Sequence, residues 1–300
     1  MTTYYIAASG SDSNNGSEAT PWRNLDYAID NSDPTDTIIV MTGTNVQTVN
    51  VDDDNQDWGS RIVKSATGNP RECILDYNGL SYSRIRADAA CEISGITFQN
   101  VFMNSANKPL FGSIGVLFEA KFIQDCIFKD IALGRDSSLS RGRSGLLVNG
   151  NTNFRRNTCI NTRGNLGGNS TNLFGIATSD NLVLNIENCT FYNDGSLPTG
   201  TASLDRAFSI FTETGGSTVV NVKNSIFSLK DGFTLGRDEY VRDDSTGTST
   251  LNTISTCLHN FSYTGSEPSV ITADPLFVDT ENEFFDLKDG SPCIGTAAIS

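Results

Sequence analysis

Ile186-Glu-Asn-Cys-Thr-Phe191 is one of six copies of a short pattern that recurs along this chain of 300 residues. The other copies occupy residues 93–98, 123–128, 155–160, 222–227 and 254–259, and consecutive copies are offset by 30, 32, 31, 36 and 32 residues. Similarity within a chain at a nearly fixed period of this length is typical of stacked repeats, in which each unit packs on its neighbours.

The columns of this pattern predict the shape of one repeat. Position one is Ile or Val in five of six copies, position four is mostly small, and position six is mostly Phe, so we expect these three to point inward. A straight strand would alternate strictly. Position three is Gly, Asn, Asp or Thr, and the first three of these tolerate a positive φ. The pattern therefore predicts two strands joined by a one-residue bend, the corner of a rung in an all-β, right-handed parallel β-helix (solenoid).

The two ends of the chain are expected to close this stack as parts of one domain. We assign residues 1–45 to an N-terminal cap, 46–270 to the rungs and 271–300 to a C-terminal closing segment. Within the cap, Leu25, Ala28 and Ile29 share one face of a short amphipathic helix that should cover the open edge of the first rung. Trp22 is expected to hold this helix in place.

Composition and charge exclude some functions. A net charge of −14 argues against nucleic-acid binding, and it repels polyanionic sugars unless a basic groove or a bound cation reverses the local field. The first residues show neither a basic segment nor an apolar segment of a signal peptide, and no apolar run reaches the roughly 18 residues of a membrane span. We expect synthesis in the cytosol and no contact with a membrane.

The seven cysteines include no Cys-x-x-Cys pair, so neither a zinc site nor a complete disulfide framework is expected. Cys126, Cys189 and Cys257 occupy the small inward position about two rungs apart. At about 4.8 Å per rung, that spacing exceeds the roughly 7 Å reach of a disulfide. We interpret these thiols as reduced core residues.

Both ends of the chain resemble a known family. Residues 4–16, beginning Tyr-Tyr-Ile-Ala-Ala-Ser-Gly-Ser-Asp, are similar to the opening strand and turn of the pectate-lyase-like right-handed β-helix superfamily. Ala273-Asp-Pro-Leu-Phe-Val-Asp279 and Gly290-Ser-Pro-Cys-Ile294 are similar to its closing segments, particularly in the branch that holds chondroitinase-B-like and alginate lyases. With the rungs between, the resemblance covers nearly the whole chain. It implies the fold strongly and an activity weakly, because many functions share this scaffold.

For a lyase, the resemblance would imply a Lys or Arg base and a calcium ion held by carboxylates. Neither the Arg-His-Gly strand of those lyases nor the Gly-His-Gly of polygalacturonase-type hydrolases is found in this sequence. Residues 52–57 and 12–16 are rich in oxygen ligands, but a solvated loop and a cap turn are the simpler interpretations. The single histidine, His259, continues the large inward column, so a core or rung-edge position is favoured over a catalytic one.

A glycan-binding groove is the best candidate site. Aligning Leu147, Ile176 and Ile210 as inward residues places Arg143, Asn172 and Arg206 in successive rungs, with Asp205 beside the last. Such a polar ladder could bind sugar hydroxyls or carboxylates, although a solvated row with local ion pairs is the simpler alternative. Trp58 is a candidate for stacking on a sugar ring.

The function that we expect is therefore a non-catalytic structural or adhesion role. By resemblance to phage tailspikes and capsid decoration proteins, the chain should be a virion surface component that binds other virion proteins or itself as a homotrimer, with glycan binding as a further property. No cofactor is required, although calcium is compatible with the resemblance. The alternatives left open are a polysaccharide lyase or glycosidase acting on an acidic polysaccharide, and a carbohydrate-binding module.

Overall fold

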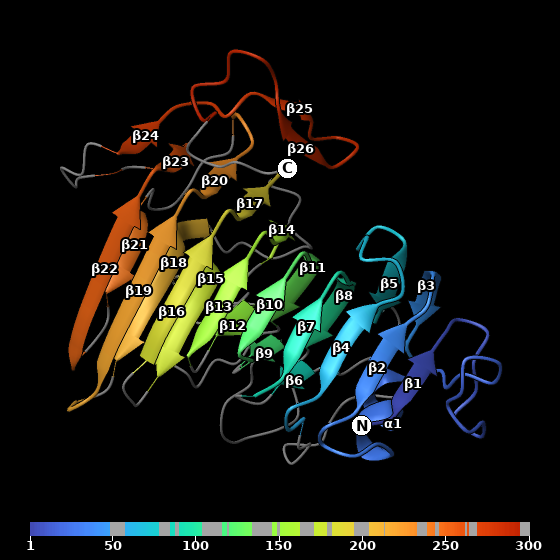
Figure 1. Ribbon diagram of the computed structural model, residues 1–300. Coiled ribbons are helices and arrows are strands. Elements are labelled where there is room, and N and C mark those ends of the chain that lie inside the picture. Colours follow the sequence, from blue (N-terminus) through green and yellow to red (C-terminus); the bar gives the residue numbers. More distant parts are fainter. Residues whose placement is uncertain are drawn as a thin grey trace.

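The computed structural model describes residues 1–48, 58–77, 85–87, 90–103, 116–118, 120–133, 146–148, 151–162, 171–178, 182–194, 204–212, 214–232, 239–243, 246–261, 263 and 269–294. Across these residues the chain forms three sheets of parallel strands and one short helix (Figure 1). Each strand pairs with the equivalent strand of the next rung, which is the arrangement of a right-handed parallel β-helix, as predicted. None of the described helices has the length and apolarity to cross a membrane.

Three strands, one from each sheet, make up a rung. The first sheet contains, in spatial order, β1 (Thr3–Ile6), β2 (Thr37–Val40), β4 (Ile62–Ser65), β7 (Glu92–Ser94), β10 (Phe122–Gln124), β13 (Thr152–Arg155), β16 (Leu182–Glu187), β19 (Ser217–Lys223) and β22 (Thr248–Ile254). The second contains β3 (Gly43–Val46), β5 (Cys73–Asp76), β8 (Thr97–Met103), β11 (Ile127–Leu133), β14 (Thr158–Ile160), β17 (Thr190–Asn193), β20 (Ile226–Leu229), β23 (Thr256–His259) and β24 (Val270–Thr272).

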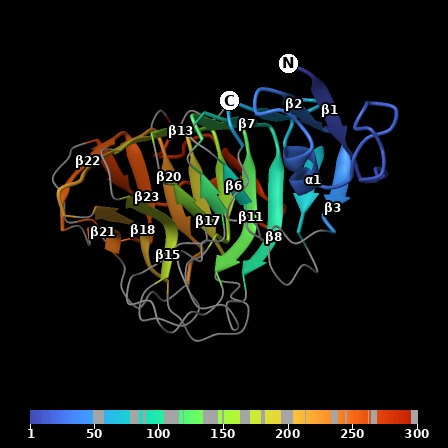
Figure 2. The same cartoon turned by 90° about the horizontal axis from the view of Figure 1, so that it is seen from below.

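The third sheet contains β6 (Ile85–Ala87), β9 (Val116–Phe118), β12 (Leu146–Val148), β15 (Thr171–Thr178), β18 (Leu204–Thr212) and β21 (Glu239–Asp243). Figure 2 shows the strands of the second sheet side by side, from β8 to β23. The outer face of this second sheet carries the candidate site described below.

A one-residue bend joins the first and second sheets in each of the six repeats, as the sequence predicts. The residue at the bend has a positive φ in all six: Gly95, Asp125, Arg156, Asn188, Asn224 and Ser255. Four of these are residues that adopt this conformation at low cost. The bend turns the chain sharply enough to place the following residue inside the core.

The third repeat begins one residue earlier than the sequence alignment indicated. Phe154 pairs with Ile123 of the preceding rung and is fully buried, whereas Arg155 is only partly buried. The bend therefore falls on Arg156, with φ of 51°, although Asn157 would tolerate that conformation better.

Two sets of contacts explain this register. Asn157 points inward, is 1% exposed, accepts a hydrogen bond from the backbone amide of Cys126 at 2.9 Å and donates one to the carbonyl of Ile123 at 2.9 Å. Arg156 forms two hydrogen bonds of 2.7 Å with the carboxylate of Asp125 in the preceding rung. The interior asparagine therefore links two rungs where the bend interrupts the regular strand pairing.

The sixth repeat is also shifted by one residue. Val222 pairs with Thr253, which is buried, while Ile254 is 51% exposed. The shift moves His259 out of the inward column: it pairs with Ser228 on the second sheet, one position beyond the buried Leu258. The expectation that His259 continues the inward column was therefore wrong, because the alignment followed the isoleucine rather than the bend at Ser255.

Stacked phenyl rings run through the core across five rungs. Adjacent ring centroids lie 5.5, 5.8, 6.3 and 4.5 Å apart along the series Phe98, Phe128, Phe154, Phe191 and Phe227. In the third repeat the small Cys159 of β14 occupies the position of the phenylalanines, and Phe154 of β13 supplies the ring instead. The predicted column of inward phenylalanines is confirmed, except that in the third repeat the ring comes from a different position.

The short helix expected near the N-terminus is present. Helix α1 (Leu25–Asp30) buries Leu25, Ala28 and Ile29 and lies at the N-terminal end of the stack (Figure 1). The Trp22 ring stacks on Tyr4 with a centroid distance of 4.6 Å and meets Tyr27 edge-on at 5.6 Å. These contacts of Trp22 therefore hold helix α1 against strand β1.

The closing segment lies along the side of the β-helix. Its antiparallel strands, β25 (Phe277–Asp279) and β26 (Phe284–Leu287), pack Phe277 and Phe285 on the outward-facing Ile160 and Tyr192 of the second sheet. Further along, Glu283 forms an ion pair with Lys129 at 2.5 Å. The segment thus covers the outer face of several rungs (Figure 1).

A disulfide between Cys257 and Cys293 attaches this segment to the sixth repeat. The expectation of a reduced Cys257 was wrong for two reasons: the register shift places this residue on the outer face of the second sheet, and its partner comes from outside the repeats. Cys126 and Cys189 are free and buried, as predicted. Burial raises the pKa of each of these two thiols to about 12, so both are protonated and unreactive at neutral pH.

Candidate functional site

A polar pocket lies where the closing segment crosses the second sheet. Its volume is about 300 Å³, and its wall includes Lys230, Asp231, His259, Asp274 and Lys288. The first two belong to the turn after β20, His259 ends β23, and the last two belong to the closing segment. Tyr192, Ser228 and Thr280 complete the polar lining. The pocket therefore combines carboxylates, ammonium groups, hydroxyls and one imidazole.

The imidazole of His259 is held in one orientation. Its Nδ1 lies 3.0 Å from the hydroxyl oxygen of Ser228, a side chain that is 1% exposed on the neighbouring strand. Its Nε2 lies 3.3 Å from an Oδ1 of Asp231. The side chain of His259 is 13% exposed and that of Asp231 is 80% exposed, so the Nε2 edge of the ring faces the open side of the pocket.

This Ser-His-Asp series is inverted relative to the triads that perform acyl transfer. In those triads an accessible serine attacks the substrate while a buried aspartate orients the imidazole. Here the serine is the buried member and Asp231 is the exposed one. Ser228 therefore serves as the orienting group, and the chemistry available to solvent is that of the imidazole Nε2 and the carboxylates.

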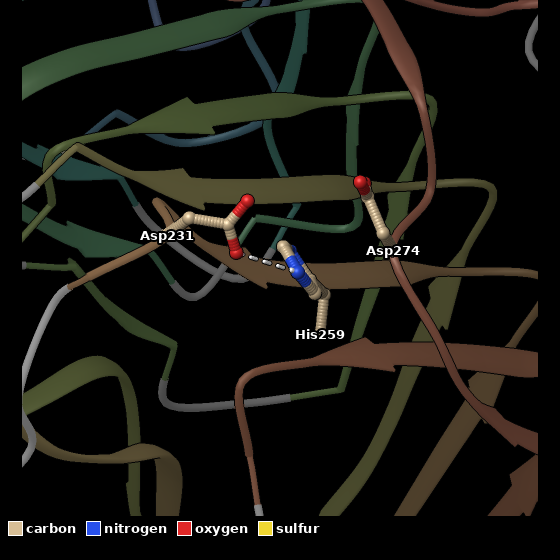
Figure 3. Close-up of side chains that lie close together, drawn as sticks. All are labelled: Asp231, His259 and Asp274. Atoms are coloured by element: carbon tan, nitrogen blue, oxygen red, sulfur yellow. Dashed lines mark ion pairs between the residues drawn. The ribbon is translucent and has the colours of Figure 1, made fainter.

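Asp274 brings a second carboxylate to the same point (Figure 3). One ligand atom each from Asp231, His259 and Asp274 lies within 4.8 Å of the others. Asp274 is fixed by a hydrogen bond of 2.8 Å that its Oδ1 accepts from the amide of Leu276, and Asp231 accepts one of 3.2 Å from the side chain of Asn260. Two backbone turns and one strand end thus converge on this cluster.

The predicted polar ladder is only partly within the described residues. The backbones of Asn172 and Arg206 are paired in neighbouring rungs, as expected. Asp205 falls at an irregularity of this pairing, because Thr171 pairs with Leu204 and the next pair is formed by Asn172 and Arg206.

The alignment that placed Arg143 in this ladder shifts by one residue. Ile176 pairs with Val148, whereas Leu147 pairs with Gly175, although Ile176 and Ile210 pair as predicted. Arg143 itself lies outside the described residues. The arginine–asparagine groove therefore stays a prediction.

Trp58 does not match the expected stacking role. Its side chain is 2% exposed and belongs to the main hydrophobic core, so its ring has no free face for a sugar. Of the two oxygen-rich segments, residues 52–57 lie outside the described part of the chain. In the other segment, Asp12 accepts hydrogen bonds from the backbone amides of Arg23 and Asn24, at 3.0 and 3.1 Å, and thereby shapes the cap turn.

The sequence did not single out Asp231 or Asp274 as site residues, and the alignment of the repeats placed His259 in the inward column. The signal that could have located this site is the bend residue: aligning the sixth repeat on Ser255 would have placed His259 on the outer face. Asp274 belongs to the Asp-Pro-Leu-Phe stretch that carried the family resemblance, but the sequence does not indicate which rung this stretch covers.

No family model matches this chain, and no curated protein sequence matches it. Among solved structures, it is similar to a rhamnogalacturonan lyase, with 14% sequence identity, a TM-score of 0.46 and coverage of 87% of this chain and 74% of the other. It is also similar to the pectate lyase Pel9A, with 12% identity, a TM-score of 0.42 and coverage of 97% and 90%. These likenesses concern the fold alone. The pairing of its parallel strands gives this chain a right-handed parallel β-helix fold.

Proposed function

We propose that this protein is a non-catalytic adhesion protein that binds carbohydrate in the pocket beside His259. The observation that carries the proposal is the composition of the pocket wall, in which Asp231 and Asp274 offer acceptors while Lys230 and Lys288 offer donors. Sugars present closely spaced hydroxyls that both donate and accept hydrogen bonds. A volume of about 300 Å³ is at the lower limit of small-molecule sites, which suits one or two sugar residues.

The two ammonium groups favour an acidic sugar over a neutral one. Because the chain carries a net charge of −14, long-range attraction of a polyanion is not available, and binding must depend on local charges. Lys230 lies on the turn after β20 and Lys288 follows β26, and both line the pocket. A uronate carboxylate between them would gain two charge-assisted hydrogen bonds.

Binding to immobilised oligosaccharides of alginate, pectate and glycosaminoglycans tests this proposal. We expect one acidic class to bind, with at least tenfold weaker binding by the Lys230→Met/Lys288→Met variant. Lys64→Met, which removes an exposed lysine on the first sheet, is the matched control and should bind as the wild type does. Absence of binding to every class, or equal binding by all three proteins, would refute the proposal.

The same polysaccharides distinguish binding from catalysis. The pocket places an imidazole beside two carboxylates, which is an arrangement capable of proton transfer, so a lyase or glycosidase is the second candidate function. A lyase releases an unsaturated uronate that absorbs in the near ultraviolet, and a glycosidase releases reducing ends. Either product, if lost in the His259→Gln variant, would replace the adhesion proposal by an enzymatic one.

The setting that we propose for this adhesion is the surface of a virion, as a capsid decoration protein or a tail spike. A β-helix is a rigid rod whose side loops can carry recognition residues. Mass spectrometry of purified particles and sedimentation of the isolated chain test this setting. The chain should be present in the particles and should sediment as a trimer, and its absence from particles would refute the virion role.

A further inference from the structure

We propose that Asp231, His259 and Asp274 form a binding site for a divalent transition-metal ion of the Zn²⁺ type. The three residues are far apart in the sequence and meet only in the folded chain, in the pocket beside β23 (Figure 3). This inference shares Asp231 and Asp274 with the proposed glycan binding, but it goes beyond that function and is tested with the ion alone.

The distances are close to those of a tetrahedral site. Two ligands that each lie about 2.0–2.1 Å from the same ion are about 3.4 Å apart in this geometry. The separation of 3.3 Å between His259 Nε2 and Asp231 Oδ1 already has this value. One ligand atom of each of the three residues lies within 4.8 Å of the others, so movements of about 1.4 Å or less bring the set to tetrahedral separations.

The residues that surround the ligands support metal binding by the imidazole. A metal-bound histidine uses the lone pair of one ring nitrogen and donates the other N–H to a fixed acceptor. The buried hydroxyl of Ser228, 3.0 Å from Nδ1, can accept that hydrogen bond and leaves Nε2 directed at the carboxylate of Asp231. Asn260 likewise holds Asp231 through a hydrogen bond to Oδ1.

The donor set selects the kind of ion. One imidazole nitrogen with two carboxylate oxygens suits Zn²⁺ and its neighbours in the transition series, whereas Ca²⁺ prefers six to eight oxygens. Three protein ligands also leave one tetrahedral position directed at the pocket, where water or an oxygen of another molecule completes the shell. The two carboxylates balance the charge of the ion, while Lys230 and Lys288 are on the wall of the same pocket.

Titration of the purified full chain with Co²⁺ tests the site, because tetrahedral Co²⁺ has a visible absorption spectrum that octahedral aqueous Co²⁺ lacks. We expect one equivalent to bind with this spectrum and to be displaced by Zn²⁺ but not by a tenfold higher concentration of Ca²⁺. His259→Gln and Asp274→Asn should each weaken binding at least tenfold. Asp286→Asn, which removes an equal charge from an exposed position on the same segment, is the matched control.

Circular dichroism confirms that each variant is folded before titration. A structure with bound Zn²⁺ should show the ion about 2.0–2.2 Å from one atom of each of the three residues. Failure of the wild type to bind Co²⁺ with the tetrahedral spectrum, or equal binding by His259→Gln, would overturn the inference. Glycan binding measured in the presence of a chelator separates the two proposals, since loss of the ion leaves the lysine contacts intact.

Discussion

Replacing Asn157 by alanine removes a side chain that links two rungs inside the core. The side chain is 1% exposed, and its two hydrogen bonds, both 2.9 Å long, join it to the amide of Cys126 and the carbonyl of Ile123. Leaving a buried amide without its acceptor costs about 1–3 kcal/mol, and losing a second buried hydrogen bond adds about 0.5–1.5 kcal/mol. We therefore expect the free energy of unfolding to fall by about 2–4 kcal/mol.

Urea unfolding followed by circular dichroism measures this change. The matched control is Asn252→Ala, which removes an exposed asparagine with one side-chain hydrogen bond of 2.8 Å to Asn221, and should cost less than about 0.5 kcal/mol. A loss below about 1 kcal/mol for Asn157→Ala, or one equal to that of the control, would contradict this role of the side chain. It would mean that the asparagine is not the group that joins these rungs.

Three further changes test other parts of the structure. Phe191→Ala, within the series of stacked phenyl rings, should lower the free energy of unfolding by about 3–5 kcal/mol in thermal or urea unfolding. Val183→Ala, at a residue that is 42% exposed, should have a small effect, and similar losses for the two variants would argue against the stacked core. Cys293→Ser opens a loop of 36 residues and should cost about 4 kcal/mol, and a reductant should then destabilise only the wild type; an unaffected wild type would contradict this. Burial raises the pKa of Asp130 above its ordinary 3.8, so its contribution favours folding at low pH and is lost as the pH rises through 3.8 and then the folded value. Asp130→Asn should therefore be more stable than the wild type near pH 7 and equal to it near pH 3, whereas a variant that is less stable near pH 7 would disprove the burial argument.

The repeat could be predicted from the sequence because its bend and its inward columns depend on local rules. Glycine, asparagine and aspartate at the bend, and phenylalanine two positions after the small inward residue, indicate the corner of a rung without any long-range information. The capping helix follows from an equally local pattern, in which Leu25, Ala28 and Ile29 share one face.

The register of two repeats could not be predicted in this way. Arg156 occupies a bend that local preference assigns to Asn157, because a buried asparagine with two partners in the neighbouring rung outweighs the strain of a positive φ on arginine. That balance depends on a contact between residues 31 positions apart, so no single repeat contains the information.

The candidate site depends on the same kind of long-range contact. A shift of one residue in the sixth repeat decides whether His259 lies in the core or beside Ser228. The path of the closing segment decides whether Asp274 and Cys293 meet the outer face of the second sheet. Hydrophobic residues such as Phe277 and Phe285 indicate that this segment packs somewhere, but only the folded chain shows which rungs it covers.

The position of the imidazole depends on both the register of the sixth repeat and the path of the closing segment. Because the chain contains a single histidine, its ring protons give unambiguous NMR signals. Nuclear Overhauser contacts from these protons should reach Ser228 and the closing segment near Asp274, in the pocket on the outer face of the second sheet. Contacts to the rings of Phe227 and Phe191 would place His259 inside the β-helix and contradict both the register and the site.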